Sequence, residues 1–194
     1  MNTQINLYNE KKAAQVVAML IYLNGKPLNM LKLVKLVYNI DREAFKRWYR
    51  PITFDKFCSM ENGQVVSNIY DNVKYENRNR KSYWNSLFQT KEVSEKKYEV
   101  LLINNYDEEF INELSRSEIE LIIEVFEHYK NKTANQMIKE HHNPAQFPEY
   151  IDPGKSSVET KYSYLLEKLK VDKKTIDKIE SDIEGLRYIA SMIH

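Results

Sequence analysis

The chain has 194 residues, of which 42% are hydrophobic, and a formal net charge of +1. This composition is sufficient for a continuous core, and the near-neutral charge excludes a general electrostatic attraction to nucleic acid or to a membrane surface. Cys58 is the single cysteine, which excludes an intramolecular disulfide and a zinc site built on several cysteines. We therefore expect a folded protein of a reducing compartment.

The amino-terminal sequence predicts a cytoplasmic protein. Met1 to Asn9 is polar, and the first apolar run, Ala13 to Leu23, is much shorter than the roughly 20 residues that span a bilayer. We expect no signal peptide and no membrane association.

Two helices are predicted in the first 50 residues. The first begins after Asn9 and ends at Asn24-Gly25, where glycine tolerates a left-handed C-cap. Pro27 is expected to open the second, and Arg50-Pro51 to end it. Its apolar positions form two adjacent rows, so most of its circumference is predicted to be buried.

The remaining side of the second helix is predicted to be a basic line that faces water or a partner. Its members are separated by three, four, three and four residues, which places them on one face; they are Lys32, Lys35, Asn39, Arg42 and Lys46. We interpret them as candidate partner-binding residues. At least as strong is the alternative that they pair internally with the acidic segment Tyr106 to Glu127, which holds eight acids and one base.

The middle of the chain is predicted to contain a small antiparallel sheet of two or three strands. Phe54 to Glu61 has strand character and precedes the turn signal Asn62-Gly63. Val66 to Tyr75 is predicted to be helical, and Arg78 to Lys81 to be an exposed loop. Ser86 to Thr90 and Tyr98 to Ile103 then give two β-rich runs around a polar turn.

Helical signals return in the last third of the chain. Ser115 and Glu118 form a capping box, and Thr133 is expected to cap a short helix that ends before Pro144. Turn formers at 152–157 predict a boundary between a domain at 1–151 and a helical extension at 152–194. The predicted fold is α+β and predominantly α-helical, with a C-terminal helical hairpin.

The last helix carries a narrow apolar seam at helical spacing. Its members are Ile176, Ile179, Ile183, Leu186, Ala190 and Ile193, and the helix before it is predicted to use Val158, Tyr162, Leu165 and Leu169. Packing as a hairpin or against the main domain is the favoured interpretation. Homodimerisation and capture of a partner protein are the alternatives.

No set of residues indicates catalysis, a cofactor or a metal. Glu124 and His128 are four residues apart, but one such pair is weak evidence for a metal site, and Cys58 has no histidine close to it in sequence. The four glycines are scattered, so a phosphate-binding loop is not predicted. We expect that the protein is not an enzyme. The first two helices could instead form a DNA-binding helix-turn-helix, which the apolar second helix argues against.

The chain resembles the Panacea, or SocA-like, antitoxin domain over roughly residues 11–150, and most specifically over residues 32–71. The motif residues are Lys32 to Glu43 in the helix, then Arg50, Pro51, Ile52, Thr53, Asp55, Phe57, Met60, Gly63, Val65, Ile69, Tyr70 and Asp71. The chain departs from the family pattern at Gln64, where proline is usual, and at Phe147, where tryptophan is expected. The resemblance implies a prokaryotic or phage antitoxin that neutralises a cognate toxin by direct binding. Promoter-binding autoregulation and delivery of the toxin to a protease are the alternatives.

Overall fold

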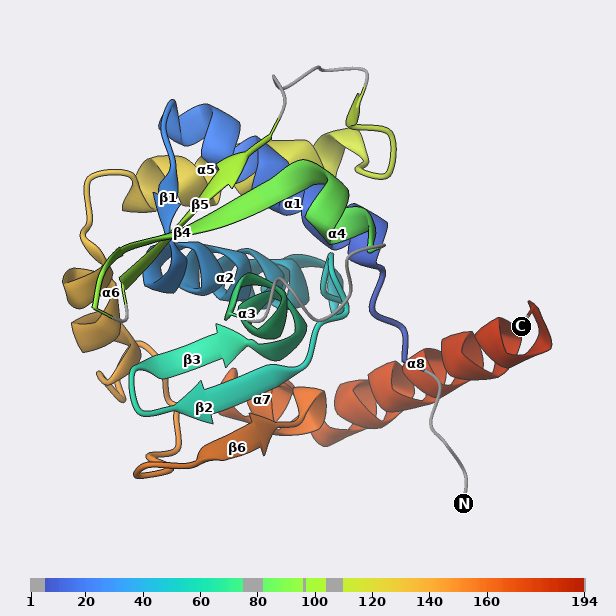
Figure 1. Cartoon of the computed structure of the whole chain (residues 1–194). Coiled ribbons are helices and arrows are strands. Elements are labelled where there is room, and N and C mark those ends of the chain that lie inside the picture. Colours follow the sequence, from blue (N-terminus) through green and yellow to red (C-terminus); the bar gives the residue numbers. More distant parts are fainter. Residues whose placement is uncertain (1–5, 75–81, 96, 104–109, 194) are drawn as a thin grey trace.

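A computed structural model describes residues 6–74, 82–95, 97–103 and 110–193 (Figure 1). Within these ranges it has eight helices and two three-stranded antiparallel sheets, which confirms the α+β, predominantly helical class. None of the described helices is both long and apolar enough to cross a membrane.

The first helix has the predicted limits, whereas the second begins later than predicted. α1 (Glu10–Asn24) starts at the N-cap Asn9 and ends at Gly25, whose φ is 65°. Pro27 does not open a helix, because β1 (Leu28–Asn29) follows it and pairs with β5 (Lys97–Leu102). α2 (Met30–Trp48) then starts with the Asn29 side chain accepting a hydrogen bond from the Lys32 amide. Pairing with the sheet thus outweighs the helix-start signal of proline.

α2 is the central element of the fold (Figure 1). It contacts α1, α3 (Ser67–Lys74), α5 (Arg116–Tyr129), α6 (Ala134–His141) and both sheets. Most of its apolar residues are buried completely, including Leu33, Leu36, Tyr38, Ile40 and Phe45, whereas Leu31 and Trp48 at its two ends are half-buried. A helix with apolar side chains on most of its circumference is stable only when other elements surround it, and this requirement places α2 in the middle.

The first sheet has the strand order β1-β5-β4. The short helix α4 (Tyr83–Leu87) leads into β4 (Phe88–Ser94), which pairs with β5 from Phe88↔Leu102 to Ser94↔Lys97. The two predicted β-rich runs therefore form a hairpin, although Ser86 and Leu87 belong to α4 and the first strand extends to Ser94. The predicted loop at Arg78 to Lys81 lies outside the described residues, in the gap at 75–81.

The second sheet has the order β3-β2-β6 and joins distant parts of the chain. β2 (Phe57–Met60) confirms the predicted strand, and Gly63, with φ 94°, supports the turn into β3 (Gly63–Val66). Two expectations were wrong. Val66 ends β3 before α3 begins, and Val158 belongs to the strand β6 (Ser157–Thr160) and not to a helix. Strands of four residues are too short to show a reliable alternation.

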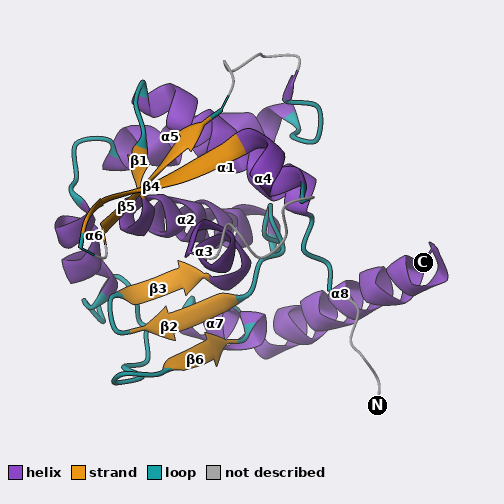
Figure 2. Ribbon diagram, viewed as in Figure 1, coloured by secondary structure: helices purple, strands orange, loops and turns teal. Residues whose placement is uncertain are grey.

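The later helices follow their capping signals. Ser115 and Glu118 form a complete capping box at α5, and Thr133 and Gln136 form another at α6. After β6, α7 (Tyr162–Lys168) and α8 (Lys173–Ile193) form the predicted helical hairpin. Figure 2 shows that α8 continues well past α7 and projects from the body. β6 follows the predicted boundary at 151/152 and pairs with β2.

Candidate partner-binding site

The structure does not place the predicted basic line on the surface. Lys35, Asn39 and Arg42 are buried, Lys32 is half-buried, and only Lys46 is exposed. The expectation of a continuous exposed line was therefore wrong. β3, α6 and the segment at 146–149 cover this face of α2, which the spacing of charges along the helix alone could not indicate.

Lys35 lies in a pocket between β3 and α6. Its Nζ donates to the Gln64 carbonyl at 3.4 Å and lies 3.3 Å from His141 Nδ1. Burial lowers the pKa of Lys35 to about 7, and burial together with the nearby Lys35 charge holds the pKa of His141 well below its usual value. A Cβ at Gly63 would lie 2.7 Å from His141 Cβ and 2.9 Å from Lys35 Nζ, so glycine supplies space here as well as a positive φ.

Arg42 forms a buried ion pair with Glu149. Its Nε donates to Glu149 Oε1 at 2.6 Å and its Nη2 donates to the Gln146 carbonyl at 2.7 Å. Tyr38 Oη donates to the same carboxylate at 2.7 Å, and the guanidinium lies 4.7 Å from the ring centre of Phe147. The alternative of internal pairing thus holds for Arg42, but its partner lies at 149 and not in the acidic segment. A buried pair of this kind fixes α2 to the segment after α6.

The acidic segment pairs with other basic residues. Lys12 of α1 lies 2.8 Å from Glu118, and Arg47 at the end of α2 pairs with Glu124.

Two other members of the predicted basic line have partners outside the acidic segment. Lys32 donates to the Lys130 carbonyl, and Lys46 pairs with Glu43 on its own helix. The amide of Asn39 is buried without a hydrogen-bond partner in the described part of the chain.

Two motif carboxylates hold the backbone that follows α2. Asp41 accepts hydrogen bonds from the Ile52 and Thr53 amides at 2.8 and 3.1 Å. Asp55 accepts from the Asn68 and Ile69 amides at 2.9 and 3.0 Å, at the start of α3. Burial raises the pKa of Asp41 to about 7 and that of Asp55 to about 6. These residues act as scaffold, because their oxygens satisfy backbone donors.

Groups with possible chemistry do not form a reactive cluster. Glu124 is engaged by Arg47, and no group of residues suited to a metal ion occurs within the described ranges. Cys58 lies in β2, as expected, and burial raises the pKa of its thiol, which keeps it protonated and weakly nucleophilic. α2 is buried on most sides, so it does not present a free face to a DNA groove as a recognition helix must.

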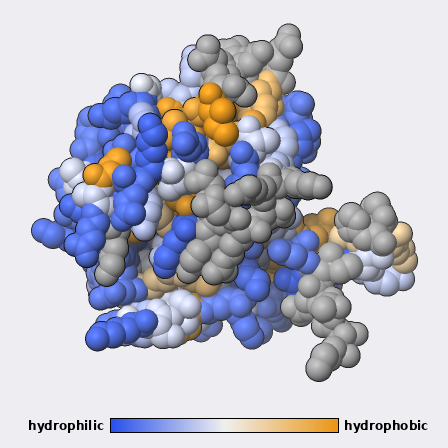
Figure 3. All heavy atoms as spheres, viewed as in Figure 1, coloured by the Kyte–Doolittle hydropathy of each residue, from blue (hydrophilic) through white to orange (hydrophobic). Residues whose placement is uncertain are grey.

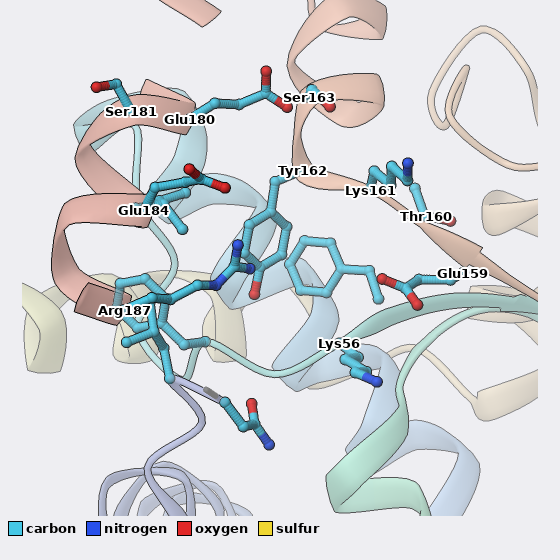
Figure 4. Close-up of a pocket in the computed structure, with 15 residues that line it drawn as sticks. Lys56, Glu159, Thr160, Lys161, Tyr162, Ser163, Glu180, Ser181, Glu184 and Arg187 are labelled. Carbon is cyan, nitrogen blue, oxygen red and sulfur yellow. The ribbon is translucent and has the colours of Figure 1, made fainter. Parts of the chain in front are cut away.

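A cavity lies between the body and α8. It has a volume of about 740 Å³ and is lined by Phe57, Tyr162 and charged residues of both signs. Its charged lining comprises Lys56, Lys161, Arg187, Glu159, Glu180 and Glu184. Figure 4 shows the Arg187 guanidinium beside the ring of Tyr162. These six side chains form no ion pair with one another, so their charges remain accessible to a partner.

Beyond this cavity the seam of α8 changes from buried to exposed. Ile176, Ile179 and Ile183 are at most 7% exposed, whereas Leu186 is 46% and Ile189 is 55% exposed. The space-filling view shows hydrophobic residues along this projecting helix (Figure 3). The first three residues of the predicted seam thus pack within the chain, whereas Leu186 of the seam, and Ile189 beside it, are on the surface.

Sequence reasoning missed several buried partners of the motif. Glu149, Gln64 and His141 complete the contacts of Arg42 and Lys35, but they lie 29 to 107 residues away from their partners in the chain. The one available signal was that Glu149 stands between Phe147 and Tyr150, where a charge needs a partner if its neighbours are buried.

Comparison with known proteins identifies a family model that covers many of the residues described above. The model of the family described as antitoxin SocA-like, Panacea domain, matches residues 33–146, which is more than half of the chain. No curated protein and no solved structure matches the chain. The matched range begins in α2 and includes Asp41, Asp55, Gly63 and His141, the residues that hold the centre of the fold together. The chain therefore belongs to the SocA-like Panacea antitoxin family.

Proposed function

We propose that the protein is an antitoxin of a prokaryotic or phage toxin–antitoxin system and neutralises a cognate protein toxin by direct binding. Membership of the SocA-like Panacea family is the observation that carries this proposal. Its partner is a toxin protein, its place of action is the cytoplasm, and a role in defence against phage is part of the same proposal.

The contacts of the motif residues support binding in preference to catalysis. Asp41 and Asp55 accept hydrogen bonds from backbone amides, and the Arg42 guanidinium donates to the Glu149 carboxylate. An enzyme needs acids, bases or nucleophiles that converge on a cavity where substrate can reach them. Here the groups with the most perturbed pKa values are enclosed in the core, so we infer that the protein is not an enzyme and needs no cofactor.

We propose that neutralisation occurs by stoichiometric coverage of the toxin's active site or substrate-binding site. Two of the predicted partner-binding residues, exposed Lys46 and half-buried Lys32, can touch a partner directly. The complete predicted set is Lys32, Lys35, Asn39, Arg42 and Lys46. The three buried members would influence binding through the shape of the scaffold. Delivery of the toxin to a protease is the competing mechanism.

The test is expression of the protein encoded by the neighbouring gene, with and without this chain, in growing cells. Rescue of growth, with a complex that co-purifies at a fixed ratio, is the expected result. Rescue of growth accompanied by disappearance of the toxin would favour delivery for degradation, if deletion of a cellular protease brings the toxin level back. Toxicity without rescue and without a complex would reject neutralisation of that toxin, and retardation of the chain's own promoter DNA would then support autoregulation.

A further inference from the structure

The distal part of α8 carries the densest group of exposed apolar side chains in the described structure. Leu186, Tyr188, Ile189 and Met192 are 46%, 65%, 55% and 65% exposed. The other exposed large hydrophobic side chains belong to several different elements of the body. Single exposed apolar residues are normal on a protein surface, whereas a contiguous group marks an interaction site.

The arrangement of these residues fits a groove. Leu186, Ile189 and Ala190 stand at i, i+3 and i+4, the spacing of helices that bind in apolar grooves. At 100° per residue, the arc from Ala190 through Leu186 and Met192 to Tyr188 covers about 200° of the helix. A single partner helix contacts a narrow seam, so an arc of this width requires a partner surface that encloses the helix end.

Within the described ranges, the chain itself does not supply that surface. The cavity between the body and α8 is lined by Glu180, Glu184 and Arg187 of this helix, which at 100° per residue lie about opposite Ile189, so it does not receive the exposed face. The remainder of the seam is already used, because Ile176, Ile179 and Ile183 are buried in the hairpin and against the body.

A second copy of the chain also fits poorly. A homodimer formed by this face alone would contribute the seven residues from Leu186 to Met192 per copy, whereas a stable interface uses about 20–30 residues a side. Two convex helix ends cannot enclose each other. A larger partner with an apolar groove can cover the whole arc.

We propose that the distal end of α8, residues 186–192, inserts into an apolar groove of the cognate toxin, with Leu186 and Ile189 as the buried anchors. This inference rests on the proposed function and adds the surface that makes the contact. The family match ends at residue 146, so this surface lies in a part of the chain that the shared domain does not include. The projecting helix then selects the toxin, while the shared domain supplies the platform.

The test uses the full chain, the protein encoded by the neighbouring gene, and two charge insertions of the same kind. Ile189→Asp places a carboxylate among the anchors, and Ile123→Asp places one on α5, where Ile123 is 40% exposed. Both sites are on the surface of helices, so both variants are expected to fold, and their melting temperatures verify this. Binding is measured by calorimetry, and the mass of each variant alone by light scattering.

The expected result is at least tenfold weaker binding of the toxin by Ile189→Asp and binding within twofold of the unchanged chain by Ile123→Asp. Unchanged binding by Ile189→Asp, or equal loss in both variants, would overturn the assignment to α8 and leave the proposed function intact. An unmodified chain that is dimeric alone, and monomeric as Ile189→Asp, would show that a second copy covers this face. Absence of any complex with the unmodified chain would instead refute the proposed function.

Discussion

At the scale of single residues, the buried ammonium of Lys35 is the most unusual feature of the fold. The side chain is fully buried, and its closest polar neighbours are the Gln64 carbonyl and the His141 ring, neither of which carries a compensating negative charge. Burial therefore lowers the pKa of Lys35 from 10.5 to about 7. The unfolded chain binds this proton more tightly than the folded chain, so the free energy of unfolding must rise with pH between these two values.

We expect this dependence to disappear in Lys35→Met. Between pH 7.5 and 9.5 the contribution of Lys35 to the free energy of unfolding should rise by roughly 2 kcal/mol, since one pKa unit corresponds to about 1.4 kcal/mol. The interval lies above the raised pKa values of Asp41 and Asp55, at about 7 and about 6, which limits their influence. Urea unfolding of both proteins at the two pH values measures the difference.

Exposed Lys46 provides the matched control. Lys46→Met removes the same group from the same helix, where the ammonium is in contact with water and with Glu43. The free energy of unfolding of Lys46→Met should change with pH as it does in the unmodified chain. Parallel curves for Lys35→Met and the unmodified chain would mean that Lys35 is hydrated in solution and that β3 and α6 do not seal it.

At the scale of elements, the two halves of α8 should differ sharply in what they contribute to stability. Ile179 is 6% exposed and Ile189 is 55% exposed on the same helix. Ile179→Ala removes buried methyl groups and leaves a cavity, so a loss of about 2–4 kcal/mol is expected. Ile189→Ala removes groups that already face water and should stay within about 0.5 kcal/mol of the unmodified chain. Thermal and urea unfolding compare the two, and equal losses would show that the distal half packs against the body.

Element limits were predictable where local chemistry sets them. Asn9, Gly25, Ser115 and Thr133 stand where their caps form, because a cap involves residues within one turn. β6 was missed because it depends on pairing with β2, which is far away in sequence. β3 follows β2 directly across a short turn, but it is too short to be recognised as a strand from its own residues. The four residues of either strand alone would not be stable.

The candidate site also depends on contacts between residues that are distant in sequence. The spacing of Lys35, Asn39 and Arg42 correctly places them on one face of a helix, but not what covers that face. The usual rule that charged residues face water fails here, since Glu149 offers Arg42 a buried partner 107 residues later. Conversely, the seam of α8 was predicted correctly as apolar, but only the three-dimensional path of the helix shows that Ile176, Ile179 and Ile183 are buried while Leu186 is exposed.

At the scale of the whole molecule, the region from residue 152 onward completes the core of the preceding domain. Tyr162 of α7 packs between Phe45 and Phe57, with ring centres 4.8 and 5.2 Å away, and donates to the Asp55 carbonyl at 2.7 Å. Leu165 and Leu166 are fully buried behind it. Each such side chain contributes about 1.5–3 kcal/mol by burial, and three together are comparable with the 5–15 kcal/mol that stabilises a typical domain.

A fragment of residues 1–151 is therefore expected to lose its cooperative unfolding. It lacks β6, the edge partner of β2, and exposes Phe57 to water, so it should bind a hydrophobic dye and melt broadly or far below the full chain. A fragment of residues 1–185 retains the β6 pairing, Tyr162 and the buried part of α8, and should melt within a few degrees of the full chain. Calorimetry of both fragments measures this contrast. If 1–151 melted cooperatively at the temperature of the full chain, the boundary at 151/152 would separate two independent units; the contacts of Tyr162 argue that the chain folds across it as one.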